Sequence, residues 1–176
     1  MKGRKGIVMV YTGDGKGKTT AALGLALRAS GHGEKILLVQ FCKSDPAYGE
    51  VKAIRKFLPT MDVVQSPFCR FRRKGEFEPE DFAAAEEVFR SGRDAVLSGE
   101  YDLVIFDEIN FAADNNLVKV EDILQMLQER PGHVNVVLTG RNAAAEIIAA
   151  ADMVSEVKEV KHHYQAGIEA QAGVEY

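Results

Sequence analysis

A short apolar run leading directly into a glycine-rich segment constrains this chain more than any other feature. Residues 7–11 (IVMVY) are typical of a buried parallel strand, and residues 18–30 place apolar side chains at helical spacing. Between them lies TGDGKGKTT, residues 12–20. A strand, a glycine-rich turn and a helix together can hold a polyphosphate on backbone N–H groups and the positive helix end. We therefore predict a P-loop, whose phosphate-binding residues are Gly13, Asp14, Gly15, Lys16, Gly17, Lys18, Thr19 and Thr20.

Two residues of this loop have defined chemical roles, and the spacing around them is unusual. We expect Lys18 to bridge phosphate oxygens of ATP and the Thr19 hydroxyl to bind Mg²⁺. The usual motif has a glycine, four further residues and then Gly-Lys-Thr, but Thr12 stands where that glycine should be, and counting from Gly13 leaves only three residues in between. The loop is thus one residue short. Either this is a tolerated variant, or the phosphates lie differently on it.

Apolar runs and helical periodicities alternate along the rest of the chain. We expect further strands at residues 36–39, 61–64, 103–106, 134–138 and 154–160, and helices at residues 50–57, 120–128 and 143–151. Another helix should begin at Pro79, with Phe82, Ala85, Phe89 and Val96 on its apolar face. This alternation predicts one α/β domain over residues 1–176: a P-loop (RecA-like) nucleotide-binding fold whose mostly parallel sheet is flanked by helices.

Polar residues follow several of the predicted strands, at residues 12–20, 40–43, 107–108 and 139–141. Ligands of such sheets bind at the carboxyl ends of the strands, so these segments should line one site. One carboxylate of Asp107-Glu108 would serve Mg²⁺ and the other could polarise a water, although a solvated acidic turn is the alternative. Arg141 could hold a phosphate bidentately, with a surface arginine as the alternative.

Charge and composition narrow the classes of partner. The net charge of −4 argues against a nucleic-acid-binding protein, and no apolar run approaches the roughly 20 residues that span a bilayer. The segment 68–74 (FCRFRRK) mixes aromatic and cationic side chains, which could stack on bases, cover a flat organic ligand or simply form an exposed loop. Cys42 and Cys69 are interpreted as reduced thiols. We expect a cytoplasmic protein without a membrane or nucleic-acid partner.

No nucleophile motif is apparent in the sequence. The histidines show no metal-ligand spacing, and no serine or cysteine stands beside a histidine in a nucleophile pattern. If the chain is an enzyme, a second substrate would attack the nucleotide, while the protein supplies position and charge stabilisation.

Several segments together resemble one family. They are residues 12–20, RASGHG at 28–33, VQF at 39–41, Asp107-Glu108, RPGH at 130–133, TGR at 139–141 and the tail VKHHYQAGIEAQAG at 160–173. On these segments, which span nearly the whole chain from Gly6 to Tyr176, it resembles the P-loop-type ATP:corrinoid adenosyltransferases (cob(I)alamin adenosyltransferases). The short phosphate loop combined with this tail is what makes the resemblance specific.

The resemblance implies a reaction and its partners. The 5′-deoxyadenosyl group of ATP would pass to the Co(I) of a reduced corrinoid, giving adenosylcobalamin and triphosphate in cobalamin biosynthesis. The metal would be Mg²⁺, with Mn²⁺ as a substitute, and the partners would be a second copy in a homodimer and a reductase or flavodoxin as electron donor. The alternative is a P-loop ATPase that hydrolyses ATP to ADP with a signalling or nucleic-acid partner.

The resemblance also assigns roles to individual residues. Lys18, Glu108 and Phe68 would be catalytic, with Thr19 and Glu108 on the metal and Phe68 displacing the lower axial ligand of the corrinoid. Arg28 would contact the nucleoside and Arg141 the phosphates. Two departures concern closure over the corrinoid: relatives have a tryptophan where this chain has Arg70, and an N-terminal extension where only a few residues precede the first strand.

Overall fold

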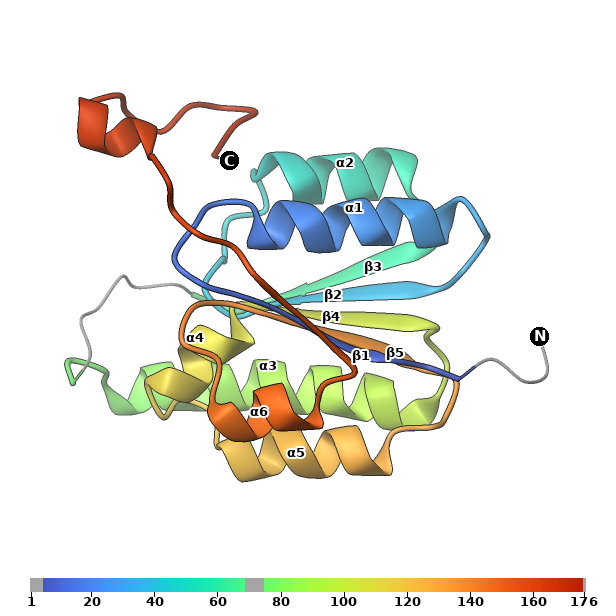
Figure 1. The fold of residues 1–176 in the computed structure, drawn as a ribbon. Helices are drawn as coiled ribbons and strands as arrows, with labels where there is room; N and C mark the ends of the chain where they lie inside the picture. Colours follow the sequence, from blue (N-terminus) through green and yellow to red (C-terminus); the bar gives the residue numbers. More distant parts are fainter. Residues whose placement is uncertain (1–4, 69–74, 176) are drawn as a thin grey trace.

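A parallel β-sheet forms the centre of the protein in the computed structural model, which describes residues 5–68 and 75–175 (Figure 1). Its strand order is β3-β2-β4-β5-β1-β6, and every neighbouring pair runs parallel. The strands are β1 (Val8–Thr12), β2 (Ile36–Gln40), β3 (Met61–Gln65), β4 (Leu103–Asp107), β5 (Asn135–Thr139) and β6 (Met153–Glu156). The predicted α/β fold with a parallel sheet is confirmed.

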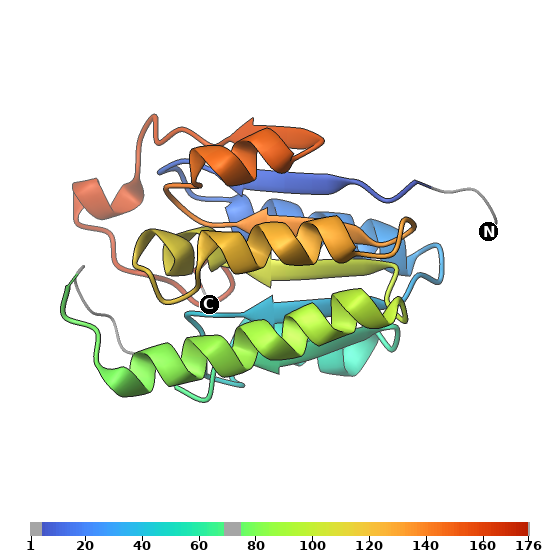
Figure 2. The same cartoon turned by 90° about the horizontal axis from the view of Figure 1, so that it is seen from below.

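Helices cover both faces of this sheet. They are α1 (Lys18–Ser30), α2 (Gly49–Phe57), α3 (Pro79–Ser98), α4 (Ile109–Asp114), α5 (Val120–Glu129) and α6 (Ala145–Ala150). Helices α1 and α2 lie on one face, whereas α3, α5 and α6 lie on the other, as the view in Figure 2 shows. In the described part of the chain, no helix is long and apolar enough to span a membrane.

Alternating side chains of the strands build a core on each face. In β4, Val104 and Phe106 pack on the side of α3 and α5, while Leu103 and Ile105 pack towards α1. All four are at most 2% exposed. Strands covered on both faces need apolar residues at every position, which is why they appear in the sequence as continuous apolar runs.

Helix α3 begins at Pro79, as predicted, and a capping box fixes this start. The carboxylate of Asp81 accepts a hydrogen bond from the backbone N–H of Glu78 at 2.8 Å. The apolar face was wrong at Phe82, which is 40% exposed. Ala85, Phe89 and Val96 are buried as predicted, but in the first turn Asp81 occupies the inward position in place of Phe82.

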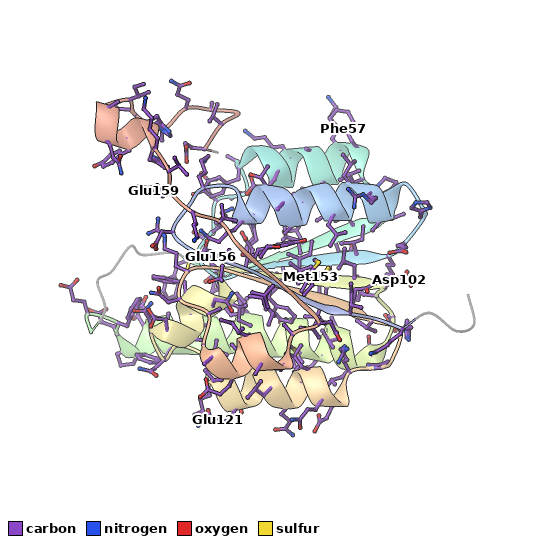
Figure 3. All side chains as sticks on the ribbon, in the orientation of Figure 1. Phe57, Asp102, Glu121, Met153, Glu156 and Glu159 are labelled. Atoms are coloured by element: carbon purple, nitrogen blue, oxygen red, sulfur yellow. The ribbon has the colours of Figure 1, made fainter. Side chains whose placement is uncertain are left out.

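The sequence prediction also differs from the structure in three short elements. Helix α4 directly after β4 was not predicted, since six residues give too little periodicity to detect. Helix α6 is shorter than expected, and the last strand ends at Glu156 instead of residue 160. Figure 3 shows Glu156 at the end of β6 and Glu159 further on, where the chain leaves the sheet towards the 3₁₀ helix at His163–Ala166.

Candidate active site

The phosphate loop connects β1 to α1 at the carboxyl edge of the sheet, and Lys18 is its most buried charged residue. The Lys18 ammonium donates hydrogen bonds to the carbonyl oxygens of Gly13 at 2.7 Å and Gly15 at 2.8 Å. Burial lowers the pKa of Lys18, against the opposing effect of the nearby carboxylate of Glu108. The ammonium is therefore held in place by the loop itself before any phosphate arrives.

Asp107, the last residue of β4, holds the hydroxyl group of Thr19. Thr19 Oγ1 donates to Asp107 Oδ1 at 2.7 Å, and Thr139 Oγ1 donates to the same oxygen at 2.9 Å. Asp107 is 1% exposed, and hydrogen bonds to a buried carboxylate are strong. Because the Thr19 O–H donates a hydrogen bond to Asp107, the lone pairs of the hydroxyl oxygen remain available for a cation.

Glu108, the residue after β4, is one of the acidic residues that line the cavity beside the loop. Its backbone is left-handed (φ 67°), which is strained for a residue other than glycine, and its N–H donates to Thr139 Oγ1 at 3.0 Å. Burial, together with the neighbouring charge of Asp107, raises the pKa of Glu108. The two carboxylates thus separate: Asp107 supports Thr19 from below, and Glu108 faces the cavity.

A cavity of about 660 Å³ opens above these residues, within the range of small-molecule sites. Its wall includes residues 14–20 of the loop, Lys43, residues 48–50, Glu108 and Arg141. These segments follow different strands, so the structure brings together the polar strand ends that the sequence predicted to form one site.

Lys43 is a cavity residue that the sequence analysis did not single out. Its ammonium lies 3.2 Å from Asp107 Oδ2 and 3.1 Å from Glu50 Oε1. Burial opposes its charge, but the two carboxylates outweigh burial and raise the pKa of Lys43. A lysine after a strand is common in sequences and does not by itself indicate this role. Its partner Glu50 lies beside it only in the folded protein.

Arg141 lies at the rim of the cavity, after β5. Its guanidinium Nε is 4.0 Å from the Asp14 carboxylate, and its Nη2 donates to the Asp14 carbonyl at 3.4 Å. The side chain is 58% exposed. It therefore contacts the phosphate loop while remaining free to turn towards an anion in the cavity.

Comparisons with known proteins agree with this geometry. The family model described as ATP:corrinoid adenosyltransferase BtuR/CobO/CobP matches residues 4–176. The chain belongs to the ATP:corrinoid adenosyltransferase family. It is 37% identical to the corrinoid adenosyltransferase of Escherichia coli (strain K12) and to corrinoid adenosyltransferase CobA of Salmonella typhimurium, each over 98% of this chain and 86% of the relative. For the enzyme of Pseudomonas aeruginosa, identity is 36% over 98% of this chain and 84% of the relative.

Membership makes the protein a transferase, and ATP-dependent adenosylation of corrinoids is the activity of its family. The resemblance identified in the sequence is thereby confirmed. The adenosyltransferase cavity described above is where ATP chemistry can take place, because it contains the phosphate loop and the oxygen ligands beside it.

Phe68 lines a second, smaller hollow that adjoins the large cavity. The aromatic side chains of Phe41, Phe68 and Phe77 line this hollow, whereas Cys42 and Phe111 line both it and the large cavity. The rings of Phe77 and Phe111 meet edge to face with centroids 6.5 Å apart. The remainder of the aromatic and basic segment, residues 69–74, lies outside the described residues.

The structure does not bring Arg28 to the cavity. It is exposed in the last turn of α1, while the phosphate loop precedes the first turn of the same helix. Arg28 lies ten positions after Lys18 in the same helix, which is about 15 Å along the helix axis. A contact between Arg28 and a nucleoside in this cavity stays a prediction.

Proposed function

We propose that this adenosyltransferase transfers the 5′-deoxyadenosyl group of ATP to the Co(I) of a reduced corrinoid and releases triphosphate. The observation that carries this proposal is the wall shared by the two hollows. Phe111 and Cys42 border both the cavity of the phosphate loop and the aromatic hollow of Phe68. The aromatic hollow, about 40 Å³, is too small to enclose a corrinoid, so a large, flat co-substrate would lie across its mouth and meet a nucleotide at this wall.

The proposed reaction is a displacement at C5′ of ATP. The electron pair of Co(I) forms the cobalt–carbon bond, and the bond from C5′ to oxygen breaks with its electrons going to triphosphate. The loop residues Lys16 and Lys18 and the rim residue Arg141 would stabilise the negative charge that grows on this leaving group. The protein then needs no nucleophile of its own.

Thr19 and Glu108 would hold Mg²⁺, or Mn²⁺ in its place. Both offer the hard oxygen ligands that such cations prefer, and Asp107 fixes the Thr19 hydroxyl at 2.7 Å in a suitable orientation. When bound, the ion would neutralise part of the triphosphate charge. The residues present therefore fit this cation.

Phe68 would displace the lower axial ligand of the corrinoid, leaving four-coordinate cobalt that is easier to reduce. Its position in an aromatic hollow beside the nucleotide cavity supports this role. We further propose that the enzyme acts as a cytoplasmic homodimer and that a reductase or flavodoxin supplies the electron.

An anaerobic assay with ATP, Mg²⁺ and chemically reduced cobalamin tests the reaction. A light-sensitive alkylcobalamin spectrum with one triphosphate per corrinoid is the expected result. If ADP and phosphate appear with no change in the corrinoid spectrum, the chain hydrolyses ATP, and the proposed transfer is wrong.

A further inference from the structure

The C-terminal segment, residues 157–175, is joined to the phosphate loop through its backbone. Val157 N–H donates to Thr12 O and Gly15 N–H donates to Val157 O, both at 2.8 Å. The contact is so close that a Cβ on Gly13 would lie 2.5 Å from Val157 O, and one on Gly15 would lie 2.7 Å from the Lys158 carbonyl. Both glycines are required for the segment to lie against the loop, and Gly13 (φ 95°) is also required for the turn itself.

The far end of the segment returns to the same loop. Figure 1 shows the chain passing through the 3₁₀ helix and then turning back above the start of α1. Glu175 Oε2 lies 2.6 Å from Lys16 Nζ, and Oε1 lies 3.5 Å from Nε2 of His163. Gly173, Val174 and Glu175 all line the large cavity. The segment thus forms one wall of the nucleotide site and places a carboxylate in it.

One oxygen of this carboxylate lacks a hydrogen bond. Glu175 Oε1 is buried and accepts none from any residue in ranges 5–68 and 75–175. Lys16 lowers the pKa of Glu175, so the carboxyl group is an anion with acceptor capacity only. Because Glu175 lines the cavity, a turn of its carboxylate would bring this unused acceptor to a ligand that supplies a donor.

The groups of ATP differ in what they can offer Glu175. The phosphate oxygens are acceptors and repel a carboxylate, but Lys16 can stand between the two anions. The ribose hydroxyls are donors, and acidic side chains bind ribose hydroxyls in other nucleotide-binding folds. Lys16 would then bind a phosphate and Glu175 would bind the ribose of the same nucleotide.

We infer that Glu175 is a nucleotide-binding residue, whose carboxylate, turned towards the cavity, accepts a hydrogen bond from a ribose hydroxyl of ATP. This inference rests on the proposed placement of the triphosphate on the loop residues 13–20. It extends the ATP site from the loop to a segment that follows it by well over a hundred residues.

A comparison of nucleotides in two variants tests the contact. Binding of Mg-ATP, 2′-deoxy-ATP, 3′-deoxy-ATP and ITP is measured by calorimetry for the wild type, Glu175→Ala and Glu169→Ala. In the wild type, loss of the contacted hydroxyl should weaken binding about tenfold, as expected for a hydrogen bond to a charged group. In Glu175→Ala this difference should fall below about twofold. Glu169, an exposed glutamate of the same segment, should leave the discrimination unchanged.

Inorganic triphosphate separates this contact from a structural role, since it has no ribose. Glu175→Ala should bind it at least as well as the wild type does. Three results would overturn the inference. Glu175→Ala could weaken the binding of triphosphate and ATP equally, or it could distinguish ATP from the deoxy nucleotides as strongly as the wild type does. It could also change the preference for ATP over ITP, which lacks the amino group of adenine. If the wild type binds ATP more tightly than the deoxy nucleotide, as expected, but forms ADP in the corrinoid assay, the proposed transfer is wrong and the ribose contact is still supported.

Discussion

Thr19 and Asp107 are joined by a 2.7 Å hydrogen bond between residues 88 positions apart, which ties the phosphate loop to the end of β4. The same carboxylate accepts from Thr139 and pairs with Lys43. One buried anion thereby positions three of the segments that surround the nucleotide cavity. The hydroxyl that we propose as a metal ligand and the segments around the cavity consequently depend on a single side chain.

Replacing Asp107 should therefore damage both stability and metal use. We expect Asp107→Ala to lower the free energy of unfolding by about 3 kcal/mol, because Lys43 loses a buried partner and two hydroxyls lose their acceptor. Urea unfolding measures this, and titration of ATP binding with Mg²⁺ should show a weaker dependence on the metal. Asp102→Asn, at the opposite end of the same strand (Figure 3), is the control. Equal effects of the two substitutions would contradict the positioning role.

Lys18 should be essential to catalysis. We expect Lys18→Met to reduce adenosylation by at least about 100-fold, because charge on the departing triphosphate loses its buried ammonium. Turnover in the anaerobic corrinoid assay measures this, with Lys158→Ala as a control because that lysine is 76% exposed. Turnover close to that of the wild type would show that ATP does not lie on the loop as proposed.

Phe68→Ala should separate the two substrates. ATP binding should stay within about twofold, because Phe68 does not line the nucleotide cavity, while adenosylation of a five-coordinate Co(II) corrinoid under weak reductant should slow about tenfold or more. The control is Phe57→Ala, since Phe57 is 66% exposed on α2 (Figure 3). An unchanged rate for Phe68→Ala would make this ring part of the core only.

Glu108 should give the protein a measurable pH dependence. Its pKa is raised in the folded state, so its contribution to stability is fully present below the ordinary pKa of glutamate and is lost as pH rises through the raised value. We expect Glu108→Gln to be more stable than the wild type at pH 7 without metal, with the difference vanishing in acid. Urea unfolding across a pH series measures the difference. A variant less stable than the wild type at pH 7 would contradict the pKa shift.

Gly15→Ala should loosen the C-terminal segment. The added methyl group would lie 2.7 Å from the Lys158 carbonyl, so we expect a loss of about 1–3 kcal/mol and faster amide hydrogen exchange in residues 157–175. Gly24→Ala provides the contrast, because nothing lies within 4 Å of its added Cβ, and helix propensity predicts a gain of about 1 kcal/mol. Unchanged exchange in the segment would show that the loop does not hold it.

The local sequence determined the elements whose signals are continuous along the chain. Helix α1 was predicted with both of its ends, and the strands of the sheet followed from apolar runs that need no distant information. The phosphate loop was equally clear, because its glycines, Lys18 and Thr19 act as one short unit. Phe82 was misplaced and α4 was missed because their signals are not local. The burial of Phe82 and the formation of the six-residue helix α4 both depend on the surface against which these residues pack.

Tertiary structure alone decided which partners meet inside the site. The pattern of residues left open which of Asp107 and Glu108 serves the metal, and only the family resemblance favoured Glu108. Their different surroundings depend on Thr19 and Thr139 arriving from other segments. Likewise, Glu175 meets Lys16 only because the C-terminal segment folds back along the loop. A sequence pattern records the periodicity of neighbouring residues, whereas hydrogen bonds and ion pairs form between whatever atoms the packed sheet brings within about 3 Å.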